Sequence, residues 1–258
     1  MRLALVVLPV IALTACEAPP VEWSVPVALA QAGGSTRLAV DTAGHARFEA
    51  AAALPAALPK ADGLCASSLR AVAGSAHFYA VWWSVRADSS GRLVAASSPD
   101  SGKTWGTAMA VDTSDIGSVG CRRPPPSVAV VGDDLHVAYS MIAPEGTGVF
   151  FAHFMSSMLH SPVAVIYGER LVSTAIAADG DRVVVAYEEP NGTRRQVDVA
   201  VSSSQGHIFE WHVTASRDID MASQPTVAIA GRHLAVAWMT QRTADSTTTH
   251  VVRSGQIQ

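Results

Sequence analysis

Short apolar runs alternate with turn residues along most of the chain. Each unit has a first strand rich in Ala and Val, a turn that carries Gly, and a second strand that ends on an aromatic residue in the clearest copies. Four clear copies span 68–82, 127–139, 174–187 and 226–238, and a weaker copy spans 36–49. Glycine accepts the positive φ that a two-residue hairpin turn requires. The pattern therefore predicts a repeated β-hairpin.

The spacing of these units predicts how they assemble. Their turn glycines, Gly74, Gly132, Gly180 and Gly231, are 58, 48 and 51 residues apart. A period near fifty in which every unit is β is typical of propeller blades. We therefore expect an all-β propeller of about five blades, with the weaker copy as a degenerate blade.

The two ends of the chain read as parts of one blade. The last repeat ends with a third strand at 250–253, and no fourth strand follows it. The segment 22–27, around Trp23, is similar to the segment 105–110 that follows a third strand. We expect the N-terminal strand to close the ring as the outer strand of the last blade, which would remove an exposed sheet edge.

The first residues read as an export signal. A positive start at Arg2 precedes an apolar run at 3–12, which is typical of a signal peptide. Leu13-Thr14-Ala15-Cys16 resembles a lipobox, and the resemblance implies that Cys16 carries lipid. The alternative is an ordinary secretion signal. We expect a signal peptide at 1–15 and, at 16–258, one propeller domain with a short tether. Glu17 favours an outer-membrane destination over the inner membrane, so the chain is expected in the bacterial cell envelope, periplasmic or surface-exposed.

Composition limits the classes of molecule that the chain is expected to bind. Hydrophobic residues make up 49% of the 258 residues and charged residues 16%, which excludes a disordered chain. The formal net charge of −4 and the lack of a basic stripe exclude nucleic acid on electrostatic grounds. We expect membrane contact only through the lipid anchor, a monomer, and no metal or cofactor, because no motif with ligand spacing occurs.

Two further cysteines remain once Cys16 is assigned to lipid. Cys65 and Cys121 each precede a first strand of neighbouring repeats. An even pair in an oxidising compartment favours a disulfide. The alternative is two buried thiols that act as small apolar residues.

One turn carries a specific motif. The segment 98–105 matches S-x-D-x-G-x-T-W at its defined positions, which are Ser98, Asp100, Gly102, Thr104 and Trp105. It resembles the Asp-box of sialidase-like (BNR-repeat) β-propellers. The resemblance implies a structural turn between the third and fourth strands of a blade, on the face away from the ligand site. A decayed copy at 202–209 has Ser204 in place of the Asp.

A ligand site is expected at the opposite end of the propeller. The loops there are rich in arginine, whose forked guanidinium suits a carboxylate or sulfate. The candidate ligand-binding residues are Arg122, Arg123, Glu188, Arg194, Arg217 and Asp218. The alternative is that these loops are polar because they contact water.

Resemblance to sialidases implies three arginines that clamp the substrate, a Tyr–Glu nucleophile pair and an Asp acid/base. The family's early Phe/Tyr-Arg-Ile-Pro motif is absent, and adjacent Tyr187 and Glu188 would point to opposite faces of a strand. We therefore assign no catalytic residue. The favoured function is a binding module for a glycan or an envelope protein. The alternatives are an exo-acting glycoside hydrolase of sialidase type and an envelope assembly factor.

Overall fold

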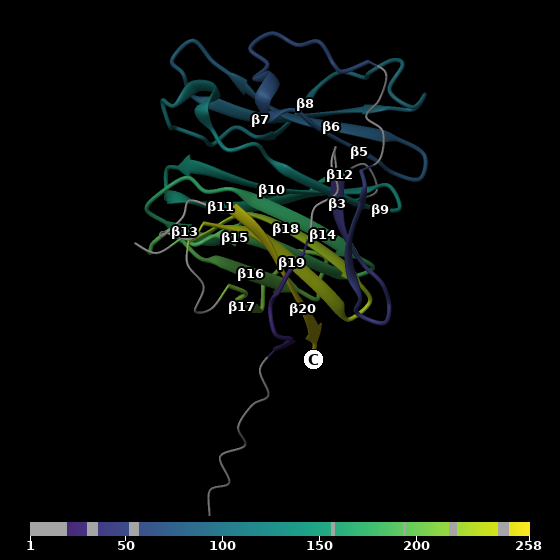
Figure 1. The fold of residues 1–258 in the computed structure, drawn as a ribbon. Coiled ribbons are helices and arrows are strands. Elements are labelled where there is room, and N and C mark those ends of the chain that lie inside the picture. The colour runs from purple at the N-terminus through teal and green to yellow at the C-terminus, as the bar shows by residue number, and fades with distance from the viewer. Residues whose placement is uncertain are drawn as a thin grey trace, which may run out of the picture.

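The computed structural model describes residues 20–29, 36–51, 57–155, 158–192, 195–216, 221–241 and 248–258. Apart from the short 3₁₀ turns η1 (Ala66–Ser68) and η2 (Gly120–Arg122), the regular structure of these residues is β. The strands form five separate sheets, which Figure 1 shows as stacked layers. The predicted signal peptide and Cys16 lie outside the described residues.

Three of the sheets run in chain order from an inner to an outer strand. The first consists of β5 (Arg70–Ala73), β6 (Phe78–Val85), β7 (Gly91–Ser98) and β8 (Met109–Asp112). The second consists of β9 (Ser127–Val131), β10 (Asp134–Ala143), β11 (Gly146–Met155), and β12 (Met158–Leu159) and β13 (Val163–Gly168), which both pair with β11. The third consists of β14 (Thr174–Asp179), β15 (Arg182–Glu188), β16 (Val197–Ser202) and β17 (Trp211–Thr214). All paired neighbours are antiparallel.

The fourth sheet joins the two ends of the described chain. It consists of β18 (Ala222–Ala230), β19 (His233–Gln241), β20 (Thr248–Ile257) and the N-terminal strands β1 (Val21–Trp23) and β2 (Val27–Ala28). Trp23 lies opposite Gly255, where an added Cβ would come 2.8 Å from the indole ring, so the glycine makes room for it. The expected closure by the N-terminal strand is confirmed.

The degenerate blade is a hairpin of β3 (Thr36–Val40) and β4 (Ala46–Ala50) that packs against the fourth sheet. Inner strands of successive sheets contact one another in the order β5, β9, β14, β18 and β3. The all-β propeller with four full blades and one degenerate blade is therefore confirmed.

The hydrophobic core lies between successive sheets. Trp83 and Tyr139 pack between the first and second sheets, and Phe151 and Tyr187 pack between the second and third. Trp238 of the fourth sheet packs against the third. The middle strands β10 and β15 are buried on both faces, so they need apolar residues at successive positions rather than alternate ones. Each fully buried aromatic side chain stabilises the fold by about 1.5–3 kcal/mol.

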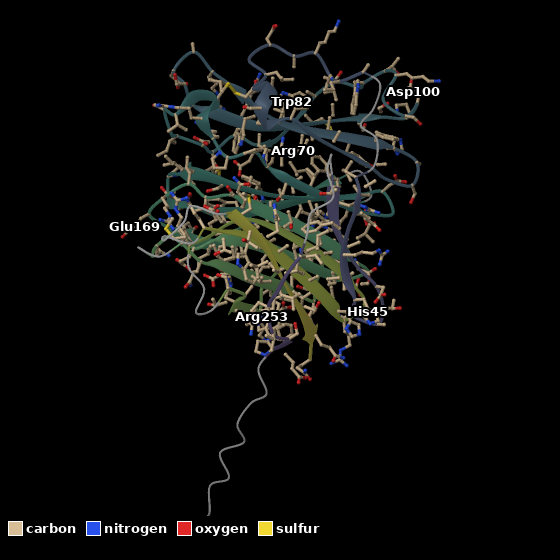
Figure 2. The ribbon with its side chains drawn as sticks, viewed as in Figure 1. His45, Arg70, Trp82, Asp100, Glu169 and Arg253 are labelled. Carbon is tan, nitrogen blue, oxygen red and sulfur yellow. A yellow bond between two sulfur atoms is a disulfide. The ribbon has the colours of Figure 1, made fainter. Side chains whose placement is uncertain are left out.

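The two ends of the blades carry different connections. Asp100, in a turn between third and fourth strands, and Glu169, in a loop between blades, lie at opposite edges of the molecule in Figure 2. We call these the turn end and the loop end. Among the described residues, no helix is long and apolar enough to cross a membrane.

Candidate functional site: the axial cavity

A cavity of about 710 Å³ lies where the inner strands meet. All five sheets contribute to its lining, which consists of Thr36, Arg37, Leu38, Arg70, Pro125, Pro126, Ser127, Val128, Ser173, Thr174, Ala175, Ile176, Gln224, Pro225, Thr226 and Val227. These residues lie near the starts of the inner strands, so the cavity belongs to the loop end. Its size falls in the range of about 300–1,000 Å³ that is typical of small-molecule sites.

Small hydroxyl side chains form part of the wall. The hydroxyls of Ser127 and Thr174, from neighbouring blades, lie 3.1 Å apart, and each lies 3.3 Å from the carbonyl oxygen of Ala138. Thr36 and Thr226 supply further hydroxyls from the fifth and fourth sheets. The inner strands thus place hydroxyl groups around a shared axis.

Two arginines, Arg37 and Arg70, line the cavity. Arg70 donates from Nη1 to the carbonyl oxygens of Leu69 at 2.8 Å and Ser67 at 3.2 Å. Burial lowers the pKa of Arg70 from its usual value, but a guanidinium stays charged in proteins. Arg37 pairs with Glu49 at 2.7 Å, and its side chain is 65% exposed. Arg70, the first residue of β5, is exposed.

Gln224 enters the cavity wall from a bulge in β18, between Ser223 and Thr226. Its φ is +51°, which is unusual for a residue with a side chain, and the backbone N–H donates to Oε1 of Glu188 at 2.9 Å. Bulges and left-handed residues cluster where a side chain is aimed at a ligand. Glu188, which the sequence predicts as a ligand residue, is not among the residues that line the cavity, and its carboxylate holds the backbone of Gln224 in place.

The remaining predicted ligand residues have other positions. Arg122 lies on the surface in η2, with Nε 3.4 Å from the carbonyl oxygen of Val119. Arg194, Arg217 and Asp218 lie outside the described residues. Neither Arg122 nor Arg123 is among the residues that line the axial cavity.

Arg123 is buried in the protein instead. Its side chain pairs with Asp115 through two hydrogen bonds, Nε to Oδ2 at 2.8 Å and Nη2 to Oδ1 at 2.9 Å. It also donates to the carbonyl oxygens of Ser89, Gly117 and Gly120 and lies over the ring of Trp83. These partners all belong to the protein itself and favour a structural role for Arg123, while its expected role as a ligand residue stays a prediction.

Cys65 and Cys121 form a disulfide with a Cα–Cα distance of 5.3 Å. It links the start of the first sheet to the loop that carries Arg123, close to the buried ion pair in sequence. The disulfide and the ion pair together hold the loop before β9 against the first sheet.

A carboxyl pair that the sequence did not indicate lies in the third sheet. Burial, together with a hydrogen bond between the Asp198 and Glu189 carboxyl groups, raises the pKa of Asp198 to about 6. Gln196 donates to Asp198, and the hydroxyl of Tyr187 on the facing strand lies 3.1 Å from Nδ1 of His212. These groups are not among the residues that line the axial cavity.

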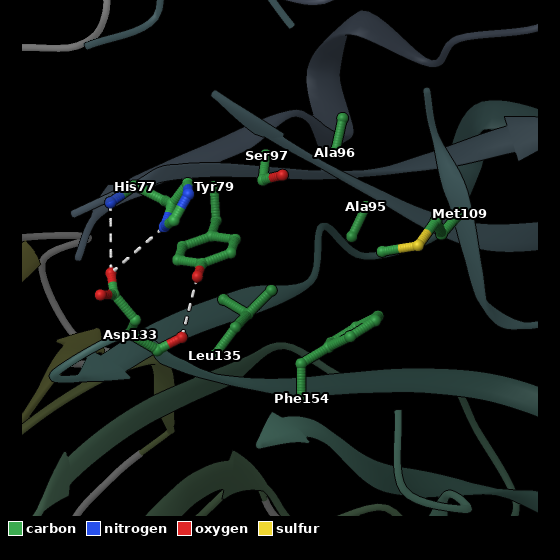
Figure 3. Close-up of a pocket in the computed structure, with 9 residues that line it drawn as sticks. All are labelled: His77, Tyr79, Ala95, Ala96, Ser97, Met109, Asp133, Leu135 and Phe154. Atoms are coloured by element: carbon green, nitrogen blue, oxygen red, sulfur yellow. Dashed lines mark hydrogen bonds and ion pairs between the residues drawn. The ribbon is translucent and has the colours of Figure 1, made fainter. Parts of the chain in front are cut away.

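A second pocket, of about 90 Å³, lies between the first and second sheets (Figure 3). The carboxylate of Asp133 accepts from the backbone N–H of His77 at 3.2 Å, and the hydroxyl of Tyr79 donates to the carbonyl oxygen of Asp133 at 2.8 Å. This volume is far below that of a sugar-binding site, and its polar groups already bond to each other.

The turn at 98–105 joins β7 and β8, as the sequence predicts for a connection between third and fourth strands. Asp100 accepts from the backbone N–H of Thr104 at 2.8 Å and from its hydroxyl at 2.7 Å. The hydroxyl of Ser98 donates to Asp100 and accepts from the N–H of Gly102. Trp105 donates from its indole to the carbonyl oxygen of Ala57 at 2.9 Å.

Comparison with known proteins rests on structure alone. No protein-family model matches the chain, and no curated protein sequence matches it. A mutant of Trypanosoma rangeli sialidase that displays trans-sialidase activity matches 87% of this chain and 39% of its own length, with a TM-score of 0.50 and 15% identity. The fold is that of a sialidase-like β-propeller.

Two other solved structures are similar. A Dyadobacter fermentans protein of unknown function matches 70% of this chain and 50% of its own length, with a TM-score of 0.51 and 12% identity. A thermostable family-43 glycoside hydrolase matches 71% of this chain at a TM-score of 0.43 and 13% identity. This chain therefore spans about half or less of the lengths of the sialidase and the Dyadobacter protein, and the likeness concerns the fold.

Proposed function

We propose that the chain is a glycan-binding propeller that holds an acidic sugar in its axial cavity. The observation that carries the proposal is the lining itself: Arg37 and Arg70 face the same cavity as a set of hydroxyls and the amide of Gln224. Guanidinium groups bind carboxylates through charge-assisted hydrogen bonds, and hydroxyl and amide groups match the hydroxyls of a sugar. A concave site also suits a sugar better than it suits a flat protein surface.

Hydrolysis is the second candidate. It is favoured by Asp198, because a carboxyl with a pKa of about 6 is suited to general acid catalysis near neutral pH. Glycosidases need two carboxyl groups that flank the bond to be cleaved. None of the described residues that line the axial cavity is a carboxylate. The lining therefore supports binding more than hydrolysis.

Calorimetric titration of the full-length chain in detergent tests the proposal. The ligands are sialyllactose and, as the matched neutral sugar, lactose. We expect sialyllactose to bind and Arg70→Ala to weaken it about 10- to 150-fold, because a hydrogen bond to a charged group contributes about 1.5–3 kcal/mol. Arg92→Ala is the control, because Arg92 is exposed on β7 and is not among the residues that line the cavity.

Each result decides between the candidates. Equal affinity for the two sugars, or no binding of either, would overturn the proposal of an acidic-sugar site. Mass spectrometry of the same mixture would detect free sialic acid, and its release by the wild type but not by Asp198→Asn would make the chain a hydrolase.

We also propose that the propeller is exported and anchored by lipid on Cys16. The disulfide supports export, because disulfides persist in oxidising compartments. The intact mass of the chain isolated from bacterial membranes tests the anchor. We expect the wild-type mass to lack residues 1–15 and to include acyl chains. In Cys16→Ser we expect neither the cleavage nor the acyl chains. A wild-type mass without acyl chains would overturn this proposal.

A further inference from the structure

Three histidines gather at the turn end of the propeller, where the second and third sheets meet. His153 lies in the buried part of β11 near its end, His160 follows β12, and His207 belongs to the turn at 202–209 that joins β16 to β17. Their nearest ring nitrogens all lie within 4.8 Å of one another. The ring centroid of His153 lies 4.5 Å from that of His160 and 4.8 Å from that of His207.

His153 gives this cluster an unusual property. The residue is 3% exposed, and neither of its ring nitrogens has a hydrogen-bond partner. A buried polar group without a partner is costly and requires an explanation such as an unseen ion. Its ring is directed at the two other imidazoles, and these are free to complete a ligand set.

We propose that His153, His160 and His207 form a binding site for a divalent transition metal, with Zn²⁺ as the ion that fits it. Imidazole nitrogen is a preferred ligand of Zn²⁺, whereas Ca²⁺ and Mg²⁺ require oxygen. Three histidines are a known zinc ligand set when a water completes the tetrahedron.

The geometry needs a small adjustment. Zn–N distances of about 2.0–2.1 Å in a tetrahedron place two nitrogens about 3.4 Å apart. The nitrogens must therefore approach by roughly 1.4 Å from their widest present separation. His207 is exposed and His160 half-buried, so their side chains can rotate toward the fixed ring of His153.

The surrounding turn holds His207 at this position. Gly206 lies so close to Phe151 of the second sheet that an added Cβ would overlap its ring. The turn at 202–209 is therefore seated on the neighbouring blade, and the residue after Gly206 faces His153. In the related turn at 98–105 the same position holds Lys103, which cannot bind a metal in this way. A bound ion would add a link between two blades that are held together by packing and by hydrogen bonds such as that between Ser127 and Thr174.

Calorimetric titration with ZnCl₂ tests the site on the full-length chain, without a histidine tag and after dialysis against a chelator. We expect one ion per chain and a rise in the unfolding temperature with Zn²⁺. His207→Ala and His160→Ala should each weaken binding at least about 10- to 100-fold, since even residues behind the ligands have effects of that size. His45→Ala is the control, because His45 is exposed on the fifth blade and contacts Asp41.

Substitution of Co²⁺ gives an independent signal. Tetrahedral nitrogen coordination should produce visible absorption bands in the wild type and in His45→Ala, and neither His207→Ala nor His160→Ala should show them. The proposal is overturned if the wild type takes up no stoichiometric Zn²⁺. It is also overturned if both histidine variants, shown to be folded by circular dichroism, bind the ion as the wild type does.

Discussion

Replacing Arg123 by alanine should destabilise the protein rather than weaken a ligand. The side chain of Arg123 is 0% exposed and that of its partner Asp115 is 2% exposed, so the substitution leaves a buried carboxylate without its counter-charge. It also removes the donor for three carbonyl oxygens of the surrounding loops. Breaking one side of a buried ion pair costs about 3–5 kcal/mol. For a domain of this size, that lowers the unfolding temperature by roughly 6–20 °C.

Urea unfolding followed by tryptophan fluorescence measures this cost. The neighbouring Arg122 provides the matched control, because it is exposed and its alanine variant should stay within about 0.5 kcal/mol of the wild type. The stability of Arg123→Lys should lie between those of the wild type and Arg123→Ala, since an ammonium keeps the charge but not the two parallel hydrogen bonds. A loss below about 1 kcal/mol in Arg123→Ala would refute the reasoning.

A double-mutant cycle separates the pair from the packing around it. We expect Arg123→Met combined with Asp115→Leu to cost less than the sum of the two single variants, because the double variant leaves no unpaired buried charge. Additive costs would show that the two side chains act independently. Loss of sialoside binding or cleavage in Arg123→Ala would then report unfolding, so Arg123 is unsuitable as a probe of the ligand site.

Three further predictions concern stability, each measured by urea unfolding. Asp100→Ala should lower the midpoint more than Asp100→Asn, because asparagine keeps an acceptor for the N–H of Thr104; equal losses would contradict this. Replacing Cys65 and Cys121 by alanine should cost about 4 kcal/mol, the loop entropy for a separation of 56 residues, and an unchanged midpoint would contradict it. Burial lowers the pKa of His136 to about 4, whereas the unfolded chain takes up the proton near pH 6.5, so stability is lost as pH falls from 6.5 toward 4. Between pH 7 and 4.5, the free energy of unfolding of His136→Phe should fall by about 2–3 kcal/mol less than that of the wild type, and equal falls would contradict the assignment.

The sequence predicted the blades well because their signal is local. Alternating apolar runs and turn glycines fix a hairpin within about twenty residues, and the repeat of that hairpin fixes the propeller. Closure was also predictable, since a last blade without an outer strand and a spare strand near Trp23 complement each other. The hydroxyls at Thr36, Ser127, Thr174 and Thr226 stand at equivalent places in the repeat, and this regularity could have indicated the axial cavity.

The site residues were harder to predict because their partners are distant in sequence or hidden by loop shape. Arg122 and Arg123 are adjacent arginines in one loop, yet one is exposed and the other buried, and nothing in their local pattern separates them. Arg70 read as part of a strand, and only the meeting of five inner strands places it in a cavity. His153 and His207 lie in different blades and come together only through blade packing.

The two turns between third and fourth strands show why a decayed motif keeps its structure. Gly102 and Gly206 have φ values of +81° and +88°, and each N–H bonds to the hydroxyl of a serine four residues earlier. The second turn has Ser204 in place of Asp100, and its hydroxyl accepts from a backbone N–H at 3.3 Å rather than 2.8 Å. The Asp therefore strengthens the turn, whereas the first serine and the glycine determine its path. A motif search that requires the Asp undercounts such blades, and positions released from the motif, such as that of His207, become free to take another role.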